Sequence, residues 1–317
     1  MAPEPIRQVV SDLLPLVRQF ARGEYAIALG GSYAKGTADD EADVDLYLFA
    51  HDVSPGDGRT RVASAFSSEI ESIVSWGDGV PFRNAGTDFR FRGYNVECWL
   101  RDIGHIERSI AECRQGVVKR EFVTWTTTGF YNHCCLSDLS VMVPLDDPSD
   151  IIVRWKSEVA TYPPKLREAI VDHHLAAAEF WPDNFHYLSA IERQDVIYAT
   201  GIVQQVVHNL VQVLFALNEV YFPGDKQLDV AMAHLPKQPP KSVYQNRLRS
   251  AIRAAHVPPE AGAGGFDSGS KLCERIRALL FPGTPLTADV LRGQREALRS
   301  LLRDVRDMAA QAGADEG

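Results

Sequence analysis

The sequence predicts an α+β protein, with a small mixed β-sheet flanked by helices in the amino-terminal part and a helical bundle after it. Short apolar runs that stop at glycines alternate with helical periodicity over the first 145 residues, as expected for strands and helices packed in layers. Beyond this point the strand pattern fades, and helical periodicity dominates, most clearly over 188–220 and 286–310. We therefore predict two domains, 1–145 and 146–317, divided near the turn-rich segment 143–148.

The composition excludes several classes of protein. The 317 residues are 45% hydrophobic and 24% charged, which is ordinary for a globular protein and unlike a disordered, collagen-like or coiled-coil chain. A net charge of −9 argues against non-specific binding of nucleic acid, which requires a basic surface. The five cysteines lack disulfide or zinc spacing, no apolar run is long enough to span a membrane, and the first residues lack a signal-peptide pattern. We expect a cytoplasmic protein with reduced thiols.

The amino-terminal part reads as an ordered series of elements. Apolar residues at helical spacing predict a helix over 5–21, and a short apolar run predicts a strand at Tyr25–Leu29. A second strand is predicted at Val44–Ala50 and a further helix at 59–75. The segment Phe89–Leu100 predicts a hairpin that turns at Arg92 and Gly93.

The most informative stretch is GGSYAKGTADDEADVDLYLF, which runs from Gly30 to Phe49. Gly30 and Gly31 follow a predicted strand, where glycine lets the backbone approach a ligand closely. The backbone N–H groups that follow, with the hydroxyl of Ser32, suit phosphate oxygens. Asp43 and Asp45 lie two residues apart on the next strand, so both carboxylates face one side, and such a pair of like charges favours a bound cation. Oxygen ligands of this kind suit Mg²⁺, which completes its shell with water and phosphate.

This stretch resembles the signature of the nucleotidyltransferase superfamily, the polymerase-β-like fold, in which a Gly-Ser turn precedes a strand carrying Asp-x-Asp. The resemblance is specific over about twenty residues, although Ala42 stands where many members have serine. It implies that Gly31 and Ser32 bind a nucleoside triphosphate. It also implies that Asp43 and Asp45 bind one or two Mg²⁺ ions.

The family also carries a third carboxylate on a later strand, and Glu97 is the best candidate. By strand alternation Asn95, Glu97 and Trp99 share one face, and the turn at 92–93 places Asp88 opposite Glu97. In antibiotic-modifying members a glutamate is thought to take the proton of the substrate hydroxyl. Glu97 is therefore predicted to be a general base or a third metal ligand, and a solvated edge position is the alternative.

The helical half supplies a second resemblance. The segment from Ala216 to Lys226, ALNEVYFPGDK, resembles the helix-end motif of aminoglycoside-type adenylyltransferases. It implies that Lys226 contacts the triphosphate, with the helix ended by the Pro-Gly pair at 223–224; a plain solvated lysine is the alternative. Arg193, in the segment Glu192–Asp195, is a further candidate for binding the nucleotide.

The expected reaction is attack by a substrate hydroxyl on the α-phosphorus of ATP, or of another nucleoside triphosphate, with release of pyrophosphate. The resemblance favours a small-molecule acceptor such as an aminoglycoside or lincosamide antibiotic, and the acidic charge would attract a polycationic sugar. Two alternatives stay open. One is a toxin-like or regulatory transferase that modifies a protein or a tRNA end. The other is a catalytically silent nucleotide-binding module.

Overall fold

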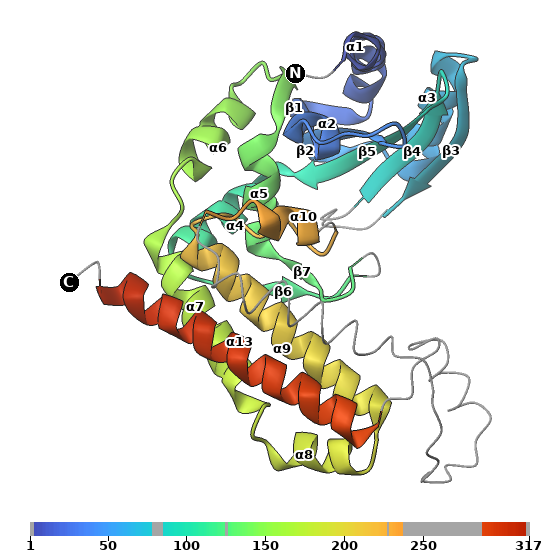
Figure 1. Ribbon diagram of the computed structural model, residues 1–317. Coiled ribbons are helices and arrows are strands. Elements are labelled where there is room, and N and C mark those ends of the chain that lie inside the picture. Colours follow the sequence, from blue (N-terminus) through green and yellow to red (C-terminus); the bar gives the residue numbers. More distant parts are fainter. Residues whose placement is uncertain (1–2, 78–84, 124–125, 227, 237–286, 315–317) are drawn as a thin grey trace. The chain divides into compact units, whose positions relative to one another are not determined.

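The computed structural model describes residues 3–77, 85–123, 126–226, 228–236 and 287–314. By its internal contacts the chain divides into two compact units, residues 1–163 and 164–317 (Figure 1). The boundary between the units lies after residue 163 and not at the predicted residue 145, because residues 146–163 belong to the first unit. Strand β8 (Val143–Asp146) pairs with a strand of the sheet, and helix α6 (Ile151–Val159) follows it.

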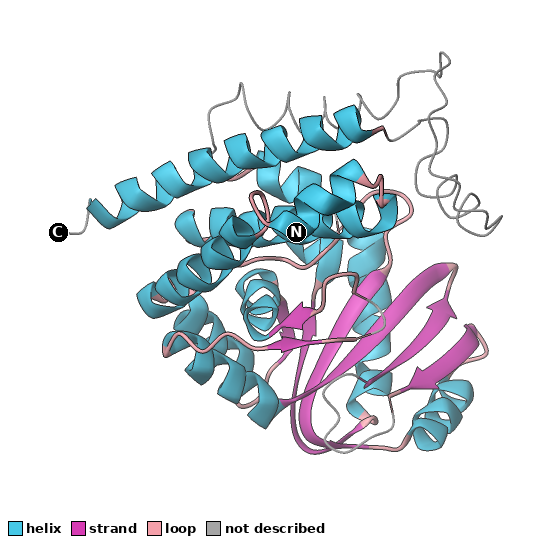
Figure 2. Ribbon diagram, turned by 90° about the horizontal axis from the view of Figure 1, so that it is seen from below, coloured by secondary structure: helices cyan, strands magenta, loops and turns pink. Residues whose placement is uncertain are grey.

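The first unit is built on one twisted six-stranded sheet (Figure 2). The strand order is β3-β4-β5-β2-β1-β8. The two central strands, β2 and β5, run parallel, and every other neighbouring pair is antiparallel, so the sheet is mixed as predicted. The remaining strands are β1 (Ala21–Leu29), β2 (Val44–Val53), β3 (Ile70–Trp76), β4 (Ala85–Phe91) and β5 (Tyr94–Asp102). A separate two-stranded ribbon consists of β6 (Arg120–Glu121) and β7 (Phe130–Tyr131).

One face of the sheet carries the main apolar core. Helix α1 (Glu4–Arg18) places its apolar stripe there, as the periodicity of 5–21 predicts. Helix α3 (Gly56–Phe66) adds Ala63 to the same cluster. From the strands, this core contains alternate residues such as Leu46 and Leu48 of β2, which are fully buried. Burial of this kind stabilises by roughly 25 cal/mol per Å² of apolar surface.

The opposite face of the sheet is more polar and aromatic. Three helices of the first unit follow β5 along the chain: α4 (Ile103–Arg114), α5 (Asn132–Val141) and α6. Trp155 of α6 contacts Phe49 of β2 edge-on, with ring centroids 5.2 Å apart. The carboxylate of Asp147 accepts hydrogen bonds from three backbone N–H groups at the start of α6. This residue of the turn-rich segment therefore caps the helix.

The predicted helix at 59–75 is too long. Helix α3 ends at Phe66, and residues 70–76 form the edge strand β3, which pairs with β4. Ser67 adopts an extended conformation directly after the helix. The β-branched residues Ile70, Ile73 and Val74 favour the strand that follows. The predicted hairpin is confirmed, since Phe91 pairs with Tyr94 around a turn in which both central residues have positive φ.

The second unit is helical in its described parts. Its helices are α7 (Pro164–Phe180), α8 (Phe185–Glu192), α9 (Val196–Leu217), α10 (Leu228–Ala233) and α13 (Ala288–Ala314). Helix α9 packs against both α7 and α13. The predicted helical stretch 188–220 is interrupted, because Gln194 has a φ of 53° and Asp195 caps α9 by accepting the N–H of Tyr198.

Helix α9 has the length and mean hydropathy of a membrane-spanning segment, yet most of its apolar window is buried inside the protein. Within the described residues it is the one helix with these properties. A core helix of a folded domain has the same character.

Candidate active site

Three carboxylates form one row across adjacent strands on the polar face of the first unit's sheet. Asp45 of β2 lies beside Glu97 of β5 in the parallel pair, and Glu97 lies beside Asp88 of β4 in the antiparallel pair. Adjacent strands are about 4.8 Å apart, so the row spans about 10 Å. The predicted pairing of Asp88 with Glu97 is confirmed, and Phe89 and Val96 are buried on the other face.

The row carries an excess of negative charge. Burial, together with the nearby carboxylates of Glu97, Asp138 and Asp43, raises the pKa of Asp45 to about 7. Burial also raises the pKa of Asp88 to about 6, to which Glu97 and Asp43 contribute. Asp43, immediately before β2, thus lies within electrostatic reach of the row. In the part of the chain that the structure describes, none of Asp43, Asp45, Asp88 and Glu97 forms an ion pair with lysine, arginine or histidine.

The double-glycine turn packs directly against this row. Gly30 directly follows β1 and donates its N–H to the carbonyl of Asp45 at 2.9 Å. Gly31 begins the short helix α2 (Gly31–Lys35) with a φ of 57°, a left-handed conformation that favours glycine. A Cβ on Gly31 would lie 1.7 Å from Oδ2 of Asp45, so only glycine lets the turn approach this carboxylate. Ser32 follows in a half-buried position.

An aromatic row lies next to the acidic row on the same face. Tyr47, Trp99 and Trp76 come from β2, β5 and β3, and their rings contact in succession. The indole of Trp99 donates to Oε2 of Glu97 at 3.1 Å, and the indole of Trp76 donates to Oδ2 of Asp88 at 2.8 Å. Trp99 also lowers the pKa of Asp45 by hydrogen bonding. Two indole N–H groups therefore face the carboxylates.

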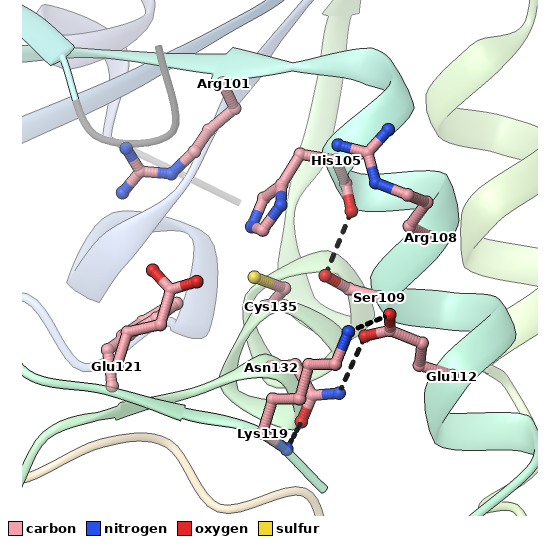
Figure 3. Close-up of a pocket in the computed structure, with 10 residues that line it drawn as sticks. Arg101, His105, Arg108, Ser109, Glu112, Lys119, Glu121, Asn132 and Cys135 are labelled. Atoms are coloured by element: carbon pink, nitrogen blue, oxygen red, sulfur yellow. Dashed lines mark hydrogen bonds and ion pairs between the residues drawn. The ribbon is translucent and has the colours of Figure 1, made fainter. Parts of the chain in front are cut away.

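A pocket opens where β5 runs into helix α4. It encloses about 590 Å³ when its mouth is included. Arg101, His105 and Arg108 line one side, and Lys119 and Glu121 line the other (Figure 3). Glu112 pairs with Lys119 and also accepts from Asn132. Arg101 shares the face of Glu97 and Trp99 by strand alternation, so the pocket adjoins the aromatic row.

Two charged residues near the row were not predicted from the sequence. Asp138 of α5 lies within electrostatic reach of Asp45, and burial raises its pKa to about 6 against the opposing charges of Lys35 and Arg101. Arg101 is 6% exposed, and its guanidinium lies 4.7 Å from the ring centre of Trp99. Strand alternation could have placed Arg101 on this face. No local signal marks Asp138, because its position depends on how α5 packs.

Two predicted site residues belong to the second unit. Arg193 is exposed at the end of α8, and Lys226 is exposed after α9. Helix α9 ends at Leu217, where Asn218 caps it and Glu219 adopts a φ of 55°. The predicted end at Pro223 and Gly224 is therefore wrong, since the chain leaves the helix earlier. Contact of Lys226 and Arg193 with a nucleotide stays a prediction.

The donor set fits a divalent cation that is partly held by phosphate. Within the described ranges, no three His, Cys, Asp or Glu side chains are grouped closely enough to hold an ion by themselves. Mg²⁺ does not require such a cage, because it usually takes one or two carboxylates and completes its shell with water and substrate phosphate. Asp43 and Asp45 supply this number of ligands, and the clustered carboxylates around Asp45 favour a cation there.

Comparison with known proteins gives a match to a family model and similarities to solved structures. Residues 136–228 match the model of a family described as a domain of unknown function, DUF4037. No curated protein matches the sequence. Among solved structures, the chain is similar to the crystal structure of a nucleotidyltransferase-like protein from Exiguobacterium sibiricum 255-15. That match has a TM-score of 0.32 and 11% identity, and it covers 97% of this chain and 78% of the other.

Proposed function

We propose that this chain is a Mg²⁺-dependent nucleotidyltransferase that transfers a nucleoside monophosphate, AMP from ATP, to a hydroxyl group of a small molecule. The observation that carries the proposal is the row Asp45, Glu97 and Asp88, which forms no ion pair with the described residues and has the Gly30–Ser32 turn packed against Asp45. We assign the catalytic role to the first unit, and binding of a nucleotide by Lys226 and Arg193 stays a separate prediction.

The chemistry follows from where the groups lie. Backbone N–H groups of Gly31 and Ser32 and the hydroxyl of Ser32 bind phosphate oxygens beside Asp45. Asp43 and Asp45 would hold Mg²⁺, which would supply positive charge to neutralise the phosphates. The acceptor oxygen forms a bond to the α-phosphorus while the bond from that phosphorus to the bridging oxygen breaks, and pyrophosphate leaves. Glu97 takes the hydroxyl proton, or it serves as a further metal ligand instead.

We propose a small-molecule acceptor, and an aminoglycoside-like antibiotic is the first class to test. The net charge of −9 and the acidic row both favour a cationic acceptor over a nucleic acid. The pocket of Figure 3 places cationic side chains close to the aromatic row, so acceptors that carry an anionic group belong in the same screen.

The test compares the full-length wild-type protein with Asp45→Asn. Each is incubated with ATP, Mg²⁺ and a library of antibiotics and metabolites, and acceptors are analysed for a mass gain of one nucleotidyl group. We expect wild-type turnover and a loss of at least about 100-fold in the variant, because one ligand of the cation is replaced by a neutral amide. Melting curves of both proteins control for folding. Equal turnover would contradict the metal assignment.

The two alternatives predict different products. A transferase acting on macromolecules would label protein or tRNA from radiolabelled ATP and leave the library unmodified. A silent module would release pyrophosphate no faster with Mg²⁺ than without it, whichever of the four triphosphates is supplied.

A further inference from the structure

Two tryptophans donate their indole N–H groups to members of the acidic row. Trp99 of β5 donates to Glu97 at 3.1 Å, and Trp76 of β3 donates to Asp88 at 2.8 Å. In both cases the acid belongs to the row of Asp45 and the indole to the neighbouring aromatic row. The same arrangement therefore occurs twice on one face of the sheet.

An indole has chemical consequences that an arginine or lysine would not have. Its single N–H is a donor only, so it engages one carboxylate oxygen and leaves the other available. It carries no charge, so the carboxylate keeps its full attraction for a cation. A guanidinium at the same place would form a bidentate pair and compete with the metal for both oxygens. The indoles thus orient Glu97 and Asp88 without cancelling their charge, and the described residues place no cationic partner on either acid.

The ring of Trp99 is held in place from several sides. Tyr47 stacks at 6.4 Å between ring centres, Trp76 contacts it edge-on at 5.0 Å, and the buried guanidinium of Arg101 lies 4.7 Å from its centre. These contacts restrict the rotation of the indole and so fix the direction of its N–H. Its N–H therefore keeps one direction, toward the carboxylate of Glu97.

We propose that Trp99 is a positioning residue for the transfer reaction, holding the carboxylate of Glu97 in the orientation that serves Mg²⁺ and substrate. Trp76 has the same role for Asp88. This inference rests on the proposed function. Hydrogen-bonding partners of metal-binding groups typically change metal affinity or activity by about 10–100-fold when they are removed.

Trp155 provides a matched control. It lies on the same side of the sheet, fully buried against Phe49, and its indole N–H has no acceptor among the described residues. Replacing Trp155 with phenylalanine therefore removes a buried indole without removing a hydrogen bond to an acid. Trp99→Phe removes a similar indole together with its hydrogen bond.

The experiment titrates Mg²⁺ in the ATP turnover assay of the full-length wild type, Trp99→Phe, Trp99→His and Trp155→Phe. We expect Trp99→Phe to raise the half-saturating Mg²⁺ concentration or to lower kcat by about 10-fold or more, with the KM for ATP nearly unchanged. Trp99→His keeps a ring N–H and should retain more activity, although its smaller ring fills less space. Trp155→Phe should behave like the wild type.

The possible results separate the two proposals. If Trp99→Phe matches Trp155→Phe, or if Trp99→His loses as much as Trp99→Phe, the positioning role is wrong while the transferase activity stands. If the wild type and Asp45→Asn both lack Mg²⁺-dependent turnover, the proposed transferase function is wrong, and the role of Trp99, which rests on it, is wrong as well. A measurement on the wild-type protein alone gives a second test. Its Trp99 indole ¹⁵N–¹H resonance should move when MgCl₂ and ATP are added, and an unmoved resonance would also overturn the inference.

Discussion

At the scale of single residues, the contact of Gly31 with Asp45 joins the phosphate-binding turn to the proposed metal site. The glycine is required for two separate reasons, its φ of 57° and the position of Oδ2 of Asp45 where a side chain would begin. Sequence reasoning identified the turn and the acids as separate parts of one motif. That the turn touches Asp45 depends on the pairing of β1 with β2, which the spacing alone does not define.

We expect Gly31→Ala to abolish activity, because the new methyl group must push the Asp45 carboxylate out of place. Gly36→Ala is the matched control: Gly36 has a φ of 72°, but nothing lies within 4 Å of a Cβ placed there. Both variants should lose about 1–2 kcal/mol of stability from the left-handed conformation. Turnover assays and chemical denaturation of both proteins check this, and equal activity of the two would contradict the argument.

At the scale of elements, Arg59 joins helix α3 to the strands beneath it. This fully buried side chain donates to Thr87 of β4 at 2.9 Å and to the carbonyl of Ser54 at 2.7 Å. Two further bonds reach the carbonyls of Trp76 and Gly86 at 3.2 Å. The guanidinium therefore holds the carboxyl end of β3, where Trp76 lies.

We expect Arg59→Met to cost about 3 kcal/mol or more, because several buried carbonyl groups lose their donor at once. Arg61→Met on the same helix is the control. Arg61 is exposed and donates to the carbonyl of Asp57, so its replacement should change stability by no more than about 0.5 kcal/mol. Urea denaturation of both variants measures the difference, and similar midpoints would show that Arg59 has no special role in stability.

The elements also show which sequence patterns were sufficient. The alternation of apolar and polar residues and the turn at Gly93 were sufficient to predict the hairpin of β4 and β5. The same pattern predicted that Asp88 pairs with Glu97. The helix predicted over 59–75 merged α3 with β3, since the apolar residues of this short edge strand also fit helical spacing. Residues 70–76 form a strand and not a helix because they pair with β4, which is a tertiary interaction. The interruption at Gln194 was missed because the apolar pattern continues on both sides of it.

At the scale of the whole molecule, the buried acids should make stability depend on pH. Burial raises the folded-state pKa of Asp45 to about 7 and those of Asp88 and Asp138 to about 6, whereas an unfolded aspartate titrates near 3.9. Between about pH 4 and pH 7 the folded state thus binds more protons than the unfolded state. The free energy of unfolding then falls as pH rises through this range.

We expect the melting temperature in EDTA to decrease between pH 5.5 and pH 8, by roughly 2–4 °C for each kcal/mol lost. Mg²⁺ should reduce this decrease by compensating the charge of the ionised row. Asp45→Asn should flatten the profile, whereas Asp52→Asn, which changes an exposed carboxylate of the same strand, should not. Scanning calorimetry across this range is the measurement. A wild-type profile that rises toward pH 8 in EDTA would show that the buried aspartates do not control the pH dependence.

The whole-molecule prediction of a mixed sheet followed by helices agrees with the described parts of both units. The position of the division was not accessible from composition, because 143–148 contains prolines and acids typical of a linker. Pairing of β8 with β1 and the capping of α6 by Asp147 keep this segment in the first unit. Both interactions join residues that have no distinguishing local pattern.

The parallel pairing of β2 with β5 has one more consequence. These strands occupy the interior of the six-stranded order, with neighbours on both sides, and they carry Asp45 and Glu97. Backbone amides in such strands exchange with solvent only through the largest openings of a protein. Local unfolding of the edge strands β3 and β8 would leave Asp45 and Glu97 side by side. Activity should therefore be lost on heating only when the first unit melts cooperatively.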